Sequence, residues 1–436
     1  MEFRYKNTAL FKNKEIEEYI SYFGGYIEHL EKVRKSEEYN FKESSINLAF
    51  DNKILNEVKV LAEKKIGSSL KYIFVIGIGG SSLGIKAVYD ALYGFFDSVE
   101  PKRFPKVIFI DTNDSEFLLK LKKFLQKEIK KPEEVFVNII TKSGKTIETI
   151  ANAEFTLEQL SKLKNFKERL AVITDKGSGL WKRAEDLNID RLSIPKNVGG
   201  RYSVLSAVGL FPLALLGLDI ESLREGAKNM ADMCLKLNEG NPALISAILK
   251  FQNYKNGKNI NDLFLFHPEL ESLGKWYAQL IGESIGKEKD VNGKIVNVGI
   301  TPIISIGSTD MHSLGQLFLS GAKNTYTCFV STKSKLRRKA EIPANRFFPD
   351  LVKEINGKSM SEIMDAILEG VKEAYSKKGL AYSEVIFDKI TLKSIGKFFQ
   401  WKMMEIMFLG KLIRVDPFTQ PSVDGYKAAT NRILKN

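Results

Sequence analysis

The stretch Val75-Ile76-Gly77-Ile78-Gly79-Gly80-Ser81-Ser82-Leu83-Gly84 decides the fold of this chain. An apolar, β-branched run precedes its glycines and a helix-like stretch follows them, as in the strand-to-helix turns of parallel sheets. Helix N-termini present unpaired N–H groups and the positive end of the helix dipole, so they bind anionic groups. A second segment of this kind is Ile139-Ile140-Thr141-Lys142-Ser143-Gly144-Lys145-Thr146, which adds three hydroxyls and lysines. The two turns together predict a phosphorylated ligand that is held from two sides.

Strand-like and helix-like segments alternate outward from these turns. The predicted strands of this region are 72–78, 106–110, 134–140, 170–174 and 191–194, and the predicted helices are 83–95, 115–127, 146–160 and 180–187. After a helical block at 204–255, a second alternating region has predicted strands at 262–266, 302–306, 325–330 and 384–387 and a long helix at 391–410. Residues 1–66 have helical spacing and no strand-like run. Alternation of this kind predicts two α/β domains with parallel sheets covered by helices.

The charge and composition exclude several classes of protein. The net charge is +13, but acids are interleaved with the lysines and no nucleic-acid-binding motif accompanies them, so we expect no nucleic-acid partner. The densest basic run, 333–339, is expected to be a solvated loop face. The apolar stretch 204–218 is too short to cross a bilayer and is expected to be a buried helix.

The cysteines and histidines indicate the redox environment and whether a metal site is expected. Cys234 and Cys328 form no C-x-x-C pair, which is typical of a reduced, cytoplasmic protein. The three histidines are scattered and have no zinc-ligand spacing, so we expect no metal. The N-terminus lacks the apolar core of a signal peptide, and no membrane association is expected.

Two of the turns imitate nucleotide-binding motifs. Gly77–Ser82 begins like a dinucleotide fingerprint, and Asp111 ends the next predicted strand where a ribose-binding acid would lie, but Ser82 takes the place of the third glycine. Residues 144–146 imitate the end of a Walker A loop, but Ile139 stands where that loop requires glycine. The second mismatch excludes a P-loop ATPase, while the first leaves a nicotinamide-dependent dehydrogenase open.

Two later segments contain further candidate catalytic residues. Asn197-Val198-Gly199-Gly200-Arg201-Tyr202-Ser203 places a permanent cation beside two glycines that allow close backbone approach. Gln279 and Glu283 are four residues apart and share one helix face. Because that face is otherwise apolar, we expect the proton affinity of Glu283 to be raised, which suits a base near neutral pH.

Taken in this order, these segments resemble the phosphoglucose isomerase family in its shorter bacterial form. The resemblance covers about residues 40–430, and its most specific parts are 197–203 and the segment from Gln420 to Lys427. It implies two sugar-isomerase domains, each with a five-stranded parallel sheet flanked by helices, at 67–200 and 201–436. It also implies that an N-terminal helical segment, 1–66, packs on the second domain.

The resemblance further implies a cofactor-free aldose–ketose isomerase that interconverts glucose 6-phosphate and fructose 6-phosphate through an enediolate. Glu283 would carry the proton, Arg201 would face the enediolate, and His312 with Lys427 would open the ring. The substrate-binding residues that it implies are Gly80, Ser81, Thr141, Lys142, Ser143, Thr146, Gln279 and Gln420. The family is homodimeric, so His312 would act in the site of the partner chain.

The sequence also departs from the family pattern. Thr141 replaces a serine, Lys145 stands where threonine is common, and Ser422 and Asp424 stand where glycine and glutamate are usual. Glu148 agrees with the family pattern, because it lies where the family has an acid near the histidine.

Three alternative functions remain open. They are the nicotinamide-dependent dehydrogenase, a catalytically silent sugar-phosphate sensor, and a metal-free isomerase of both glucose and mannose phosphates.

Overall fold

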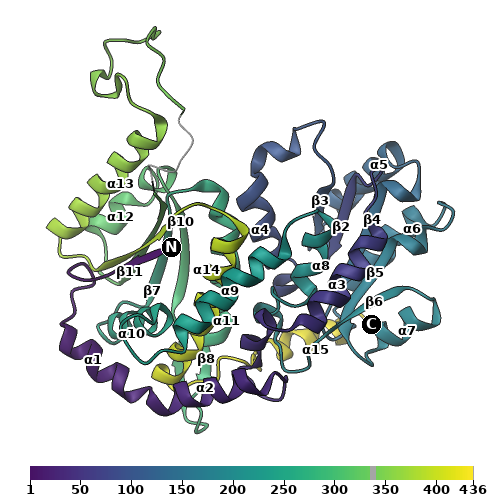
Figure 1. The fold of residues 1–436 in the computed structure, drawn as a ribbon, viewed down its shortest axis with the longest axis horizontal. Helices are drawn as coiled ribbons and strands as arrows, with labels where there is room; N and C mark the ends of the chain where they lie inside the picture. The colour runs from purple at the N-terminus through teal and green to yellow at the C-terminus, as the bar shows by residue number, and fades with distance from the viewer. Residues whose placement is uncertain (334–339, 436) are drawn as a thin grey trace.

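The computed structural model describes residues 1–333 and 340–435, which form two helix-covered sheets (Figure 1). The basic run predicted to be a solvated loop lies outside the described residues apart from Lys333. Helices α4 (Leu83–Tyr93) and α11 (Glu271–Ile285) pack against each other between the two sheets. The prediction of two α/β regions is confirmed.

The first sheet is wholly parallel, as predicted, in the order β3-β2-β4-β5-β6. Its strands are β2 (Tyr72–Ile76), β3 (Lys106–Ile110), β4 (Val135–Ile140), β5 (Leu170–Asp175) and β6 (Asp190–Ile194), and its other helices are α5 (Ser115–Glu128), α6 (Ile147–Leu160) and α7 (Gly179–Asp186). The chain runs from β2 outward to β3 and returns to β4, so the direction of winding reverses between β2 and β4. Ligands of such sheets bind at this switch point, beyond the carboxyl ends of the strands. The order is that of flavodoxin-like sheets and not the dinucleotide-binding order, which argues against the dehydrogenase.

The second sheet has the order β1-β12-β11-β7-β10. Its parallel strands are β7 (Ile260–Leu265), β10 (Thr301–Ile306), β11 (Thr325–Thr332) and β12 (Tyr382–Phe387). Strand β1 (Glu2–Arg4) pairs antiparallel with β12, so the expectation that residues 1–66 contain no strand is wrong at this point. Three residues are too few to show a strand pattern, and pairing with β12 extends the sheet nonetheless.

The rest of the N-terminal segment is helical, with α1 (Asn13–Tyr22), α2 (Gly24–Ser36) and α3 (Asn52–Lys65). The ring of Phe23 lies 5.3 Å from that of Phe408, edge to face, which joins this segment to the second half of the chain. The Lys65 ammonium pairs with Asp190 at 2.6 Å, which joins it to the first half as well. The division of the chain at residues 66 and 200 stays a prediction.

The remaining helices are α8 (Ala207–Leu215), α9 (Ile220–Cys234), α10 (Pro242–Lys255), α12 (Gly315–Ser320), α13 (Met360–Lys377), α14 (Leu392–Ile413) and α15 (Val423–Ile433). Every residue of α8 is buried, as its apolar sequence predicts. Thr391 caps α14 by accepting a hydrogen bond from the amide of Ser394. Helices α9 and α14 cross so closely that a β-carbon on Gly226 or Gly396 would lie within 2 Å of the opposing backbone. Only glycine permits this approach.

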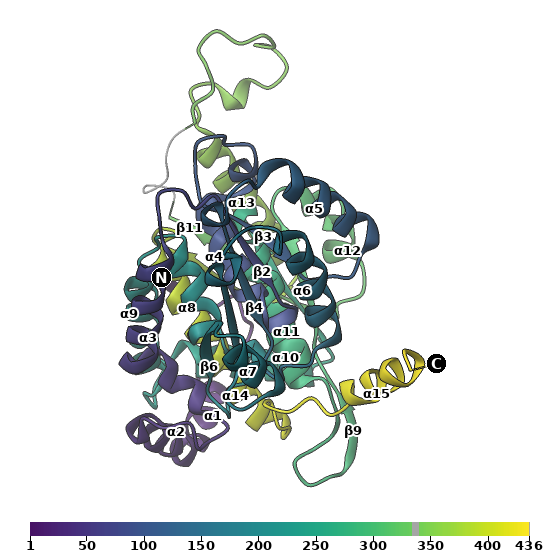
Figure 2. The ribbon, with the colours of Figure 1, turned by 90° about the vertical axis from the view of Figure 1, so that its right-hand side faces the viewer.

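Helix α15 projects from the body of the molecule and buries none of its residues (Figure 2). Nowhere in residues 1–333 and 340–435 does a helix have both the length and the apolarity needed to cross a bilayer.

Candidate active site

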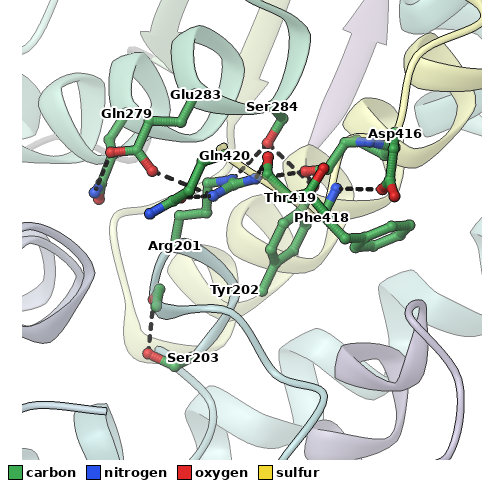
Figure 3. Close-up of polar contacts among 12 residues, drawn as sticks. Arg201, Tyr202, Ser203, Gln279, Glu283, Ser284, Asp416, Phe418, Thr419 and Gln420 are labelled. Atoms are coloured by element: carbon green, nitrogen blue, oxygen red, sulfur yellow. Dashed lines mark hydrogen bonds and ion pairs between the residues drawn. The ribbon is translucent and has the colours of Figure 1, made fainter. Parts of the chain in front are cut away.

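Arg201 is the centre of a polar cluster that joins three distant parts of the chain (Figure 3). It lies in the short helix η6 (Gly200–Tyr202), and its side chain is only 2% exposed. Its Nη1 donates to Glu283 Oε2 at 3.2 Å and also to the side-chain oxygen of Gln420. The cluster therefore contains the predicted cation, the predicted base and a predicted substrate contact.

The other guanidinium nitrogens hold the C-terminal tail. Nη2 of Arg201 donates to the carbonyl oxygens of Pro417 at 2.6 Å and Thr419 at 3.2 Å. Nε donates to Ser284 Oγ at 2.7 Å, on the helix that carries Glu283. The guanidinium has five N–H donors in a rigid fork and binds five acceptors here, more than the three donors of a lysine could bind.

Gln279 and Glu283 lie on one face of α11, as their spacing predicts, and Gln279 Nε2 donates to Glu283 Oε1 at 3.1 Å. The Glu283 side chain is 33% exposed. Its predicted apolar surroundings are wrong, because Arg201 and Gln279 each donate to one of its oxygens. Both carboxylate oxygens of Glu283 therefore have side-chain donors.

The glycine turn after β2 lies directly against this cluster. A β-carbon on Gly80 would stand 2.2 Å from the carbonyl carbon of Gly200, and one on Gly79 would stand 2.8 Å from Nε2 of Gln279. Gly79 also has a φ of +61°, which favours glycine. Ser81 ends the short helix η2 (Gly79–Ser81) and is partly exposed. These glycines therefore let the predicted phosphate turn meet Arg201 and Gln279.

The second predicted phosphate turn follows β4, the neighbour of β2. Thr141 Oγ1 and Thr146 Oγ1 are hydrogen-bonded at 2.7 Å. Thr146 occupies the N-cap position of α6, but its side chain makes no capping bond, because its hydroxyl pairs with Thr141 instead. Ser143 is exposed, and Gly144 has a φ of +68°.

Lys142 is partly buried, and its ammonium binds backbone carbonyls. Nζ donates to the carbonyl oxygens of Lys196 at 2.7 Å and Val198 at 2.9 Å. Burial lowers the pKa of Lys142, and Asp175 opposes this effect. The side chain thus ties the second phosphate turn to the loop that leads to Arg201.

Two predicted catalytic residues lie outside the cluster. Gly282, next to Glu283, faces Pro302 at the start of β10, whereas His312 follows the far end of that strand and is exposed. Lys427 is exposed on α15. Within the described residues, no hydrogen bond or ion pair joins His312, Lys427 or Glu148 to Glu283.

Sequence reasoning missed several residues of the cluster. Ser284 and the carbonyls of Pro417 and Thr419 are partners of Arg201, and backbone acceptors leave no signal in a sequence. Lys287 is also part of this region, since it is 9% exposed and hydrogen-bonded to backbone on two segments. Its position four residues after Glu283, just past a glycine, was the one available sign.

A buried group of charges lies behind α11. Glu405 Oε2 pairs with Lys402 at 2.7 Å and with Lys250 at 3.4 Å, and Tyr277 of α11 donates to Glu405 Oε1 at 2.7 Å. All four side chains are buried. The group anchors α11 to α14.

Across residues 1–333 and 340–435, no three histidine, cysteine, aspartate or glutamate side chains are grouped so as to hold a metal ion.

Comparison with known proteins places this geometry in a family. The model of the family described as phosphoglucose isomerase matches residues 52–436. The chain belongs to the phosphoglucose isomerase family. Glucose-6-phosphate isomerase of Methanocaldococcus jannaschii is 36% identical over 83% of this chain and 84% of its own length. The enzyme of that name from Campylobacter jejuni is 30% identical over 99% of both chains.

Solved structures share the fold of this chain. A hypothetical protein of Thermus thermophilus covers 100% of both chains with a TM-score of 0.86 and 27% identity. A glucose-6-phosphate isomerase of Chlamydia trachomatis has a TM-score of 0.74 over 90% of this chain and 74% of its own, at 21% identity. The latter likeness concerns the fold alone. The phosphoglucose isomerase resemblance expected from the sequence is confirmed.

Proposed function

We propose that this protein interconverts glucose 6-phosphate and fructose 6-phosphate, with Glu283 as the base. The observation that carries the proposal is the meeting of Glu283, Arg201, Gln279 and Gln420 beside the glycine turn at Gly80. Relatives named glucose-6-phosphate isomerase, at up to 36% identity, support the same substrate pair.

The chemistry needs one base and one anion-stabilising group. In the open-chain aldose, the Glu283 carboxylate removes the proton from C2, and the electrons left behind form an enediolate. The same carboxyl group returns the proton to C1, because the two carbons are adjacent. Arg201, which is always charged, stabilises the negative oxygen as it develops. The hydroxyl proton on O2 passes to O1 in the opposite direction, so the reaction is balanced: C2 is oxidised as C1 is reduced.

The phosphate would bind at the switch point between β2 and β4. Ser81, Thr141, Ser143 and Thr146 supply hydroxyls there, and the amides of both turns supply further donors. Lys142 would contribute through its backbone, because its ammonium is occupied by two carbonyl oxygens. Binding at this point fixes which sugar carbons face Glu283.

Ring opening would need a second copy of the chain. Six residues of β10 separate the end that lies near Glu283 from the end that His312 follows, and a strand of that length spans about 20 Å. A sugar phosphate bound at Glu283 therefore lies too far from the His312 of the same chain. We propose a cytoplasmic homodimer in which His312 of one chain reaches the site of its partner and opens the sugar ring there together with Lys427.

A cofactor-free assay tests the function. Fructose 6-phosphate is supplied and glucose 6-phosphate is detected. Parallel experiments test mannose 6-phosphate as a substrate and measure the binding of NADH. Glu283→Gln should abolish turnover while leaving fructose 6-phosphate binding nearly intact. Glu271→Gln is the matched control, because Glu271 is an exposed carboxylate on the same helix. Wild-type turnover in Glu283→Gln would disprove the assignment of the base, and a wild-type protein without turnover would disprove the function.

A further inference from the structure

Lys287 lies where the helix of the proposed base ends. It follows Gly286, the residue that terminates α11, and begins the short strand β8 (Lys287–Lys289). Its Nζ donates to the carbonyl oxygen of Glu283 at 2.5 Å and to that of Thr419 at 2.9 Å. One ammonium thus spans the two segments that carry Glu283 and Gln420.

The same carbonyl of Thr419 also accepts a hydrogen bond from Arg201, at 3.2 Å. Lys287 and Arg201 therefore hold the tail from two sides. Arg201 donates to the side chains of Glu283 and Gln420. Lys287 donates only to backbone, namely to the carbonyl oxygens of Glu283 and of Thr419, the residue before Gln420. Figure 3 shows that Glu283 and Gln420 converge on the guanidinium. Two of the three N–H donors of the Lys287 ammonium bind backbone carbonyls of these two segments, so its contribution is to their geometry.

Burial and nearby charges together set the pKa of the Lys287 ammonium. Burial lowers the pKa of Lys287 to about 8; the nearby Arg201 guanidinium lowers it as well, while Asp416 and Glu283 raise it. The side chain is therefore charged at neutral pH and becomes neutral as the pH rises through about 8. Charge-assisted hydrogen bonds are about twice as strong as neutral ones, so deprotonation weakens both links.

We propose that Lys287 is a positioning residue that couples the backbone of Glu283 to the tail carrying Gln420 and so keeps the proposed base aligned with the sugar. The inference rests on the proposed role of Glu283. Misplacement of a catalytic group by about 1 Å can cost about a hundredfold in rate, so a loss of this tether should be visible in kcat.

The test compares three variants of the full-length protein across a pH series from about 6 to about 9.5. Lys287→Met removes the charge but keeps an unbranched chain of similar length. Lys287→Arg keeps a charge that does not titrate in this range. Lys289→Met is the control, because Lys289 is exposed on the same strand.

We expect wild-type kcat for fructose 6-phosphate to fall above about pH 8, following the titration of Lys287. Lys287→Met should lower kcat at pH 7 by about tenfold or more, with KM within about threefold, and should lose this alkaline decline. Lys287→Arg should retain more activity than Lys287→Met, and its decline should move to higher pH. Wild-type kcat in Lys287→Met, or an alkaline decline that is the same in all variants, would overturn the proposal.

A second measurement separates this inference from the proposed function. Amide hydrogen exchange of residues 416–420 reports on the tail without any turnover. We expect faster exchange there in Lys287→Met and unchanged exchange in Lys289→Met. Unchanged exchange in Lys287→Met would show that the tail is not held by Lys287. Absence of isomerase activity in the wild type would instead defeat the assignment of Glu283 while the exchange result still stood.

Discussion

The backbones of Gly80 and Gly200 lie in direct contact, although 120 residues separate them in the chain: a β-carbon on Gly80 would stand 2.2 Å from the Gly200 carbonyl carbon. Through this contact the glycine turn of the first sheet meets the loop that carries Arg201. The alignment of the predicted phosphate turn with the predicted catalytic cation therefore depends on the absence of a side chain.

Gly80→Ala should separate these two loops and lower kcat by about a hundredfold or more, because the obstructing atoms are backbone and cannot rotate away. Gly370→Ala is the control, since an added β-carbon there meets nothing within 4 Å. Steady-state kinetics and far-ultraviolet circular dichroism of both variants would check this. Full activity in Gly80→Ala would show that the two loops need not touch.

Arg201→Lys should lower kcat by about two orders of magnitude, although it preserves the charge. A single ammonium cannot replace donors that reach Glu283, Ser284 and the tail carbonyls together. Arg183→Lys, on the exposed side of α7, provides the control. A loss of less than about threefold would reduce Arg201 to a general electrostatic role.

Complementation between inactive variants should reveal shared sites. In a dimer whose sites each use one chain's Glu283 and the other's His312, a Glu283→Gln and His312→Ala heterodimer has one intact site. The isolated heterodimer would then have about half of the wild-type activity, and an unseparated random mixture about a quarter. Co-expression of differently tagged chains, followed by assay of the mixed species, measures this. If the mixed species is inactive, each chain builds its own site.

Glu405 should make the protein sensitive to acid. Burial opposes its ionisation, but the adjacent Lys250 and Lys402 outweigh this and hold the pKa of Glu405 below its ordinary value. A carboxyl group with a lowered folded-state pKa stabilises the fold above the pKa it has when unfolded, about 4.3, and loses this contribution as the pH falls further. Urea unfolding between about pH 7 and pH 3 should therefore show stability falling below about pH 4.5.

The variant Glu405→Gln should remove that part of the acid dependence. It should also destabilise the protein at pH 7 by about 3–5 kcal/mol, because two buried ammonium groups lose their counter-ion. Glu369→Gln, at an exposed carboxylate, should leave both quantities unchanged. Equal acid sensitivity in wild type and Glu405→Gln would assign the effect to other carboxylates.

Much of the fold was predictable because its signals are local. Strands β2 and β4 are central in their sheet, so they appear as continuous apolar runs that end in glycine or hydroxyl residues. Thr391 likewise marks the start of α14 by its capping bond. Strand β1 escaped prediction because three residues have no period and its pairing partner lies about 380 residues away.

The residues of the site were likewise predictable where their signals are local and not where their partners are distant in the chain. The face shared by Gln279 and Glu283 followed from helical spacing, but the hold of Arg201 on Pro417 and Thr419 did not, because carbonyl oxygens are present at every residue. The apolar surroundings expected for Glu283 were wrong because Gln279, on the same helix face, donates to it and Arg201, 82 residues away in the chain, donates as well. The assignments of His312 and Lys427 depended on family resemblance and stay predictions.

The tail contacts of Arg201 also have a consequence for biosynthesis. Both sheets are complete once β12 has been synthesised, but three of the five acceptors of the Arg201 guanidinium come from residues 417–420, which follow about 30 residues later. A nascent chain that has not reached residues 417–420 therefore has an incomplete Arg201 cluster. A product that terminates before these residues could therefore fold extensively and still not isomerise sugar phosphate in the cell.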